Sequence, residues 1–405
     1  RKQVNKKYTW NAESVFKTAK DWEAALKAVV EDIPNVKKFE GKLGESPETL
    51  YEGMQAIEKI SLRAQTIFMY AQFAYAVDTT NQESAAMVGK AQGMAGQVFA
   101  AISFLNPELL YIGKEKLDAW MNSFEKLSTY RQSFDDLFRQ QAHVRSAEVE
   151  EILGMAADPF SGPSSSTSML VNADFKFAPA QDSKGKKVEI TQSNFYSTLL
   201  EHPDRKVRQT AFNSYHDKHV EFKNTLASNL SSSISANVFN MRARKFETTL
   251  SASLFNNNIP EEVFHNLINT FKSKLPVWHR YFDIKRKALK LKDFQYYDVW
   301  APLSKKKVPL TFEQAVDHIS DSLAPLGKEY VDTLRQGCLK DRWVDSTANT
   351  GKMNGAFSYG TPETHPFIMM SFTNDIGSMT TLAHELGNSM HSYLSWKKQP
   401  VTYSN

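Results

Sequence analysis

Cysteine is almost absent from this sequence, since Cys338 is the only one in 405 residues. A single cysteine excludes an internal disulfide and is typical of a protein kept in a reducing compartment, so we expect a cytoplasmic location. The sequence also has no run of 18 apolar residues, which excludes an ordinary transmembrane helix. It opens with RKQVNKKYTWN, without a Met or a signal peptide, so we expect that its start is trimmed.

No charge of one sign dominates the chain. The formal net charge is +4 at pH 7, and basic residues alternate with acidic ones. This balance gives no electrostatic reason to expect nucleic acid or a membrane surface as a partner. The hydrophobic content of 41% and the aromatic content of 12% are typical of a globular protein.

Helical periodicity fills most of the chain up to about residue 340. Residues 45–77 place apolar side chains at spacings of three and four, and Ser46 provides a start signal. Residues 261–290 repeat the pattern after Pro260, and Pro276 should kink or split that helix. Glycine is scarce, with 17 residues, and long alternating strand patterns are absent from this region. The sequence therefore predicts a mainly α protein.

Two stretches break this pattern. Residues 158–170, DPFSGPSSSTSML, are rich in Ser, Gly and Pro, and a segment that alternates like a β-hairpin around Lys184-Gly185 follows them. We place a domain boundary here, between a helical domain of residues 1–165 and a second domain of residues 166–405. The second break, residues 342–372, contains two short β-type runs that could pair in a small sheet, and a helix follows it.

The motif HELGNSMH, which starts at His384, differs by one residue from the zinc-peptidase pattern HExxH. Histidines at i and i+4 lie one helical turn apart and can share one zinc ion, while the intervening Glu385 lies beside the metal-bound water. Asn388 occupies the second histidine's position, and its neutral amide oxygen is a poor zinc ligand. His391 lies about 10.5 Å further along the axis, too far to share the metal. No Asp, Glu, His or Cys follows it.

The sequence around this motif, TTLAHELGNSMHSYLSWKKQPVTYSN, closely resembles the active-site helix of oligoendopeptidase F, within the thimet oligopeptidase-like family of zinc metallopeptidases. The segment GKMNGAFSYGTPETHPFIMMSF, just upstream, looks like the strand region of that family. Further segments resemble its helices, in the same order along the chain: residues 127–153, 199–215, 243–268 and 296–303.

The resemblance implies a multi-helix ellipsoid around a deep substrate channel, with a small β-sheet near the active-site helix. It also implies one zinc ion, with His384 as the first ligand, position 388 as that of the second, and a Glu on the following helix as the third. Glu385 would act as the general base. A strand edge would pair with the backbone of a short peptide substrate, and the residues expected to contact substrate there are Gly355, Ala356, Phe357 and Tyr359.

The third ligand would lie beyond Asn405, so the resemblance implies a catalytic domain that is incomplete at its C-terminus. We expect a zinc-dependent endopeptidase for short peptides that is weak or inactive as given, because Asn388 replaces a ligand. One alternative is a peptide-binding pseudoenzyme, although retention of Glu385 argues against it. Another is one half of a split peptidase, in which a C-terminal fragment or partner chain supplies the Glu.

Overall fold

The computed structural model describes residues 1, 3–191, 195, 199–304, 308–349, 351–353 and 355–404. The protein is mainly helical, with two small sheets, which confirms the predicted fold class. It forms two compact units, one of Arg1–Gln141 with Lys307–Asn405 and one of Ala142–Lys306. The two domains predicted from the sequence, residues 1–165 and 166–405, have other bounds than these units. The predicted domain boundary stays a prediction. The enclosed channel also stays a prediction.

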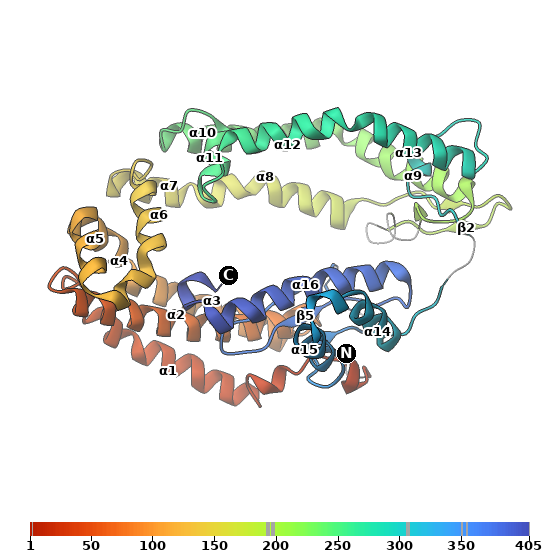
Figure 1. The fold of residues 1–405 in the computed structure, drawn as a ribbon. Coiled ribbons are helices and arrows are strands. Elements are labelled where there is room, and N and C mark those ends of the chain that lie inside the picture. Colours follow the sequence, from red (N-terminus) through yellow and green to blue (C-terminus); the bar gives the residue numbers. More distant parts are fainter. Residues whose placement is uncertain are drawn as a thin grey trace. The chain divides into compact units, whose positions relative to one another are not determined.

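The first unit contains nine described α-helices (Figure 1). Six lie in its N-terminal segment: α1 (Ala19–Lys37), α2 (Pro47–Ala76), α3 (Gln82–Ile102), α4 (Leu105–Ile112), α5 (Lys114–Ser123) and α6 (Arg131–Gln141). Three lie in its C-terminal segment: α14 (Phe312–Ser322), α15 (Lys328–Leu339) and α16 (Ile376–Lys398).

Helix α2 shows how local sequence sets these elements. The side chain of Ser46 accepts a hydrogen bond from the backbone N–H of Thr49, so the helix begins where the sequence predicts. Helices α1, α2 and α3 pack around a shared apolar core, and the indole N–H of Trp22 donates to the carbonyl of Ile67 at 2.9 Å. This hydrogen bond gives the buried indole N–H a partner within the apolar core.

The sheet of this unit has the strand order β3 (Val344–Asp345), β5 (Phe367–Met369) and β4 (Phe357–Tyr359). Strand β5 is parallel to β3 and antiparallel to β4, which confirms the predicted pairing of the two short runs. Ile368 packs on the core that includes α16, whereas Phe367 and Met369 pack on the core that includes α2. The sheet therefore lies between α16 and the N-terminal helix α2.

The second unit contains seven described α-helices and a two-stranded hairpin (Figure 1). The helices are α7 (Ala147–Met155), α8 (Ala157–Met169), α9 (Arg205–Glu221), α10 (Lys223–Ala243), α11 (Thr249–Phe255), α12 (Glu261–Ser273) and α13 (Leu275–Ala288). Strands β1 (Ala180–Gln181) and β2 (Lys187–Val188) are antiparallel, which confirms the hairpin predicted around Lys184-Gly185.

The Ser-, Gly- and Pro-rich stretch is where the structure departs from the sequence analysis. It does not interrupt the helices, because most of it forms α8, with Pro163 inside the helix. Helix α8 packs along α10, and the side-chain amide of Asn229 donates to Thr167 Oγ1 at 3.1 Å. Tertiary packing here outweighs a poor intrinsic helix propensity. The prediction for Pro276 is confirmed, since the helix splits into α12 and α13.

Among the helices in the described part of the chain, none has both the length and the apolar character needed to cross a membrane.

Candidate active site

Helix α16 carries the predicted site, and its ends are set by local sequence. The Asp375 carboxylate accepts from the backbone N–H of Ser378 at 2.8 Å, and Ser378 Oγ accepts from the N–H of Asp375 at 3.3 Å. This reciprocal capping box begins the helix, and two lysines in the last turn suit its dipole. Leu382, Leu386 and Met390 are buried on one face, which fixes the rotation of the helix.

The three motif residues lie on adjacent turns but in different surroundings. The side chains of His384 and Asn388 are exposed, whereas Glu385 is buried, with an exposed fraction of 6%. The amide Nδ2 of Asn388 donates to Oε2 of Glu385 at 3.4 Å, which is a long hydrogen bond. The structure therefore brings the predicted general base and the second ligand position into contact.

Strand β4 lies directly beside this turn of α16. Ser358, at the centre of β4, and Ser389, next to Asn388, form a hydrogen bond between their hydroxyl oxygens at 2.7 Å. Ser389 Oγ also donates to the backbone carbonyl of Glu385 at 2.9 Å. Because β4 pairs with β5 on one side only, its other edge pairs with no strand among the described residues. A free strand edge can bind an extended peptide through backbone hydrogen bonds.

The side chains of Phe357 and Tyr359 point to the other face of the sheet. The ring of Phe357 stacks on Phe73, with centroids 5.9 Å apart, and Gln65 Nε2 donates to the Tyr359 hydroxyl at 2.7 Å. Helix α2 therefore holds both rings. The strand can offer its backbone to a peptide, whereas these two side chains are already engaged.

Gly355 and Ala356 precede the strand. Gly355 has a φ of 94°, in the left-handed region that favours glycine, and it is exposed. Ala356 is partly buried and packs on the core that includes α16. These two residues form the turn that leads the chain into the free edge of β4.

Lys352, which the sequence analysis did not identify, fixes the chain just before this turn. Its side chain is 2% exposed, and Nζ donates to Oδ1 of the fully buried Asp345 at 2.7 Å. It also donates to the backbone carbonyls of Thr347 and Met370 at 2.9 and 2.6 Å. Burial lowers the pKa of Lys352, although Asp345 acts in the opposite direction. No local signal identifies this role, because a lysine between Gly and Met is typical of an exposed turn.

The donor set does not fit a complete zinc site. His384 supplies one imidazole, and Asn388 supplies a neutral amide in place of the second. Across the described residues, no group of three or more His, Cys, Asp or Glu side chains is arranged to hold a metal ion. We therefore derive no catalytic step through a metal in this chain.

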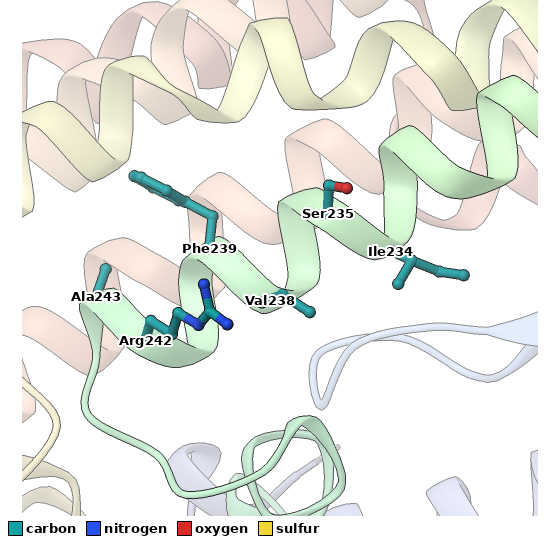
Figure 2. Close-up of a pocket in the computed structure, with 6 residues that line it drawn as sticks. All are labelled: Ile234, Ser235, Val238, Phe239, Arg242 and Ala243. Carbon is teal, nitrogen blue, oxygen red and sulfur yellow. The ribbon is translucent and has the colours of Figure 1, made fainter.

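Two cavities lie away from these residues. One, of about 590 Å³, belongs to the first unit and is lined in part by Trp343, His365 and Tyr393. The other, of about 570 Å³, lies on α10 of the second unit, and Figure 2 shows its side chains spreading from the helix rather than converging on a point. Its lining contains no His, Cys, Asp or Glu. Neither cavity is lined by the motif residues.

Comparison with known proteins places the chain among peptidases. Residues 198–405 match the profile of peptidase family M3, and residues 108–177 match a profile described as Oligopeptidase F. Oligopeptidase PepF of Bacillus subtilis is 36% identical over 406 residues, covering 100% of this chain and 60% of PepF. Group B oligopeptidase PepB of Streptococcus agalactiae is 31% identical, covering 100% of this chain and 67% of PepB. The chain thus spans about two thirds or less of these relatives.

Comparison with solved structures agrees with the sequence comparisons. A crystal structure of a protein from Chlamydophila abortus is 30% identical, with a TM-score of 0.82, and the match covers 100% of this chain and 68% of that one. Oligoendopeptidase-F from Enterococcus faecium is 27% identical, with a TM-score of 0.60, over 78% of this chain and 60% of that one. The family profiles, the relatives and the fold agree with the sequence resemblance, and the chain therefore belongs to the oligoendopeptidase F group of peptidase family M3.

Proposed function

We propose that this chain is the larger part of a zinc-dependent endopeptidase that hydrolyses short peptides, and that Asn388 makes it weak or inactive as it stands. The family assignment supports the reaction class. The length of the relatives supports an incomplete catalytic domain, since this chain spans 60% of PepF.

The observation that carries the proposal is the position of β4 beside α16. The hydrogen bond between Ser358 and Ser389 holds the free edge of the strand against the turn that contains Glu385 and Asn388. A peptide added to that edge would run past the Glu385 carboxylate, which can take up a proton as a general base. Recognition through the backbone would also tolerate many side chains, as cleavage of varied short peptides requires.

The loss at position 388 is the second part of the proposal. A histidine at this position, one turn after His384, would present an imidazole toward the same point. Asn388 instead turns its amide nitrogen toward Glu385. We infer that restoring histidine is necessary for metal binding but not sufficient, because the donors still lack a third member. A C-terminal segment or a partner chain would supply that member, a glutamate.

The test is a comparison of four proteins. The unmodified chain and its Asn388→His variant are each prepared alone and with the polypeptide that follows the aligned region of B. subtilis PepF. Zinc retained after dialysis is measured by mass spectrometry, and cleavage is measured with an internally quenched peptide. We expect about one zinc per chain, together with cleavage, only when both changes are present.

Asn388→Gln is the matched control, because it keeps an amide at this position and should restore neither zinc nor cleavage. Full activity of the unmodified chain alone would refute the claim that the site is impaired. Failure of the doubly restored protein to bind zinc would refute the assignment of position 388 as a ligand position.

A non-catalytic peptide-binding function is the second candidate. It is favoured by the incomplete donor set, combined with an unpaired β4 edge among the described residues. This function predicts a peptide affinity that is the same with zinc and with a chelator, and the same for Asn388→His. Calorimetric titration with an uncleavable peptide distinguishes it, because a metal-dependent affinity would exclude a pure binding role.

A further inference from the structure

Residues 8–11, ahead of α1, lie along the edge of the sheet that is opposite β4. The backbone N–H of Ser346 donates to the carbonyl of Tyr8 at 3.0 Å, and the N–H of Asn11 donates to the carbonyl of Arg342 at 2.8 Å. These two hydrogen bonds flank β3, so this segment covers the outer edge of that strand. Figure 1 shows the start of the chain beside α14 of the same unit. The sheet therefore has a bound chain segment at one edge and, among the described residues, an unpaired strand edge at the other.

Arg342 fixes this segment through its side chain. Its guanidinium donates to the backbone carbonyls of Thr9 and Trp10 at 3.0 and 2.8 Å. It also donates to the two carboxylate oxygens of Glu13, at 2.9 and 3.0 Å. Burial acts in the opposite direction, but hydrogen bonds from Arg342 and Lys6 lower the pKa of Glu13 to about 2, so the pair stays charged at neutral pH. The backbone of Arg342 has a φ of 56°, which is unfavourable for a residue with a side chain. The contacts with the segment offset that strain, and they fix the position of Trp10.

The Trp10 side chain extends from this segment into the core between the sheet and α2. It is 4% exposed. Its indole ring lies 4.5 Å from the ring of Phe73 on α2, 5.9 Å from that of Phe367 on β5 and 6.3 Å from that of Phe357 on β4, measured between centroids. Aromatic rings at these separations attract one another beyond the effect of burial alone. Trp10 therefore connects two neighbouring strands to the helix that packs on them.

The position of β4 depends on packing against both of its faces. The strand has three residues and pairs only with β5 among the described residues. Strands this short need packing against other elements for stability. On the α16 side, β4 is held by the hydrogen bond between Ser358 and Ser389. On the α2 side, its packing includes the contact of Phe357 with Trp10 and Phe73. Removal of the indole would leave a space in a close-packed core, and β4 would shift toward it or loosen.

We propose that Trp10 is a positioning residue for the proposed peptidase, because it keeps β4 against the turn of α16 that contains Glu385. The inference rests on the proposed function, in which a peptide bound to the edge of β4 runs past the Glu385 carboxylate. A peptide held through backbone hydrogen bonds moves with the strand, so a shift of β4 changes the distance between the scissile bond and that carboxylate. A misplacement of about 1 Å can lower a reaction rate by about 10²-fold. Loss of the Trp10 indole should therefore lower kcat more than it weakens peptide binding.

Disulfide formation between β4 and α16 tests this role in the chain alone. The hydroxyl oxygens of Ser358 and Ser389 lie 2.7 Å apart, so cysteines at both positions would bring their sulfur atoms within reach of a disulfide. Cys338 should not compete, since burial raises the pKa of its thiol to about 12. We expect the chain with Ser358→Cys and Ser389→Cys to form the disulfide in oxidised glutathione, and Trp10→Leu to slow its formation by at least about tenfold. If no disulfide forms with Trp10 present, β4 is not held beside α16 and the proposal is wrong.

A matched substitution separates positioning from general stability. Trp22 is also a buried tryptophan of the first unit, but it packs with α2 and α3 in a core that contains no described residue of β4. Trp22→Leu should therefore lower the free energy of unfolding at least as much as Trp10→Leu, yet leave the rate of disulfide formation within about threefold. Trp10→Phe keeps a ring and should slow the reaction less than Trp10→Leu. If either leucine variant does not fold, Trp10→Phe and Trp22→Phe carry the comparison. Equal slowing by both members of a pair, or slowing by neither, would overturn the proposal.

Peptide cleavage gives a second readout, in the Asn388→His protein that carries the added C-terminal polypeptide. Trp10→Leu should lower its kcat by at least about tenfold and change KM by less than about threefold. An unchanged kcat would overturn the inference and leave the proposed function standing. If disulfide formation is slowed by Trp10→Leu alone while the protein with both changes neither binds zinc nor cleaves peptide, Trp10 positions β4 and the proposed function fails.

Discussion

Replacing Lys352 with methionine tests whether a buried ion pair stabilises the chain that leads into β4, the strand proposed to bind peptide. The substitution keeps most of the side chain's apolar length but removes the ammonium. That ammonium lies 2.7 Å from Oδ1 of Asp345, whose side chain has no exposed area. It also donates to three backbone carbonyls, those of Asp345, Thr347 and Met370. All four acceptors would lose this donor in an environment that water does not reach.

The structure sets the expected magnitude. Removing one partner of a buried ion pair costs about 3–5 kcal/mol, because it leaves an uncompensated charge. Arg1 also pairs with Asp345 and compensates part of that charge. We therefore expect the lower end of the range, about 3 kcal/mol. Adding Asp345→Asn should recover part of the loss, since the second change removes the stranded charge.

Local stability is the quantity to measure, because two units need not unfold in one transition. Native-state hydrogen exchange of β3 and β5 reports it, and peptide affinity reports the effect on β4. Lys340→Met is the control, since Lys340 is exposed and its loss should change stability by no more than about 0.5 kcal/mol. If Lys352→Met cost less than about 1 kcal/mol, the assignment of the ion pair as a stabilising element would be refuted.

Two further predictions concern the first unit. An added Cβ at Gly337 would lie 2.5 Å from Cε2 of Trp343, whereas at Gly89 of α3 it would meet nothing within 4 Å. Gly337→Ala should therefore lower the free energy of unfolding by about 1–3 kcal/mol, whereas Gly89→Ala should raise it by up to about 1 kcal/mol. Urea unfolding measures both changes, and changes of the same sign would contradict the packing described here. Burial lowers the pKa of His365, so the unfolded chain binds its proton more tightly and the free energy of unfolding should fall as pH drops below about 6.5. His365→Gln should weaken that pH dependence, and an unchanged slope between pH 7 and 5 would refute the assignment.

The sequence by itself determined the local elements of the site. Asp375 and Ser378 lie three residues apart, so the two residues that cap the start of α16 lie within one helical turn. The same spacing rule places His384, Glu385 and position 388 on adjacent turns. The short alternating runs that become β4 and β5 were also predicted. Each of these signals depends on residues close together in the chain, which is why they can be read without coordinates.

Only the tertiary structure decided how these elements support one another. It joins Ser358 to Ser389, buries Lys352 against Asp345, and makes a helix of the Ser-, Gly- and Pro-rich stretch that packs on α10. It also leaves nearly every described residue of α12 and α13 unburied, although both helices carry several apolar side chains. Burial and long-range pairing depend on what the fold brings beside a residue. No local pattern encodes that neighbour, so the sequence could predict the turn with His384 and Glu385 but not the contacts that hold it in place.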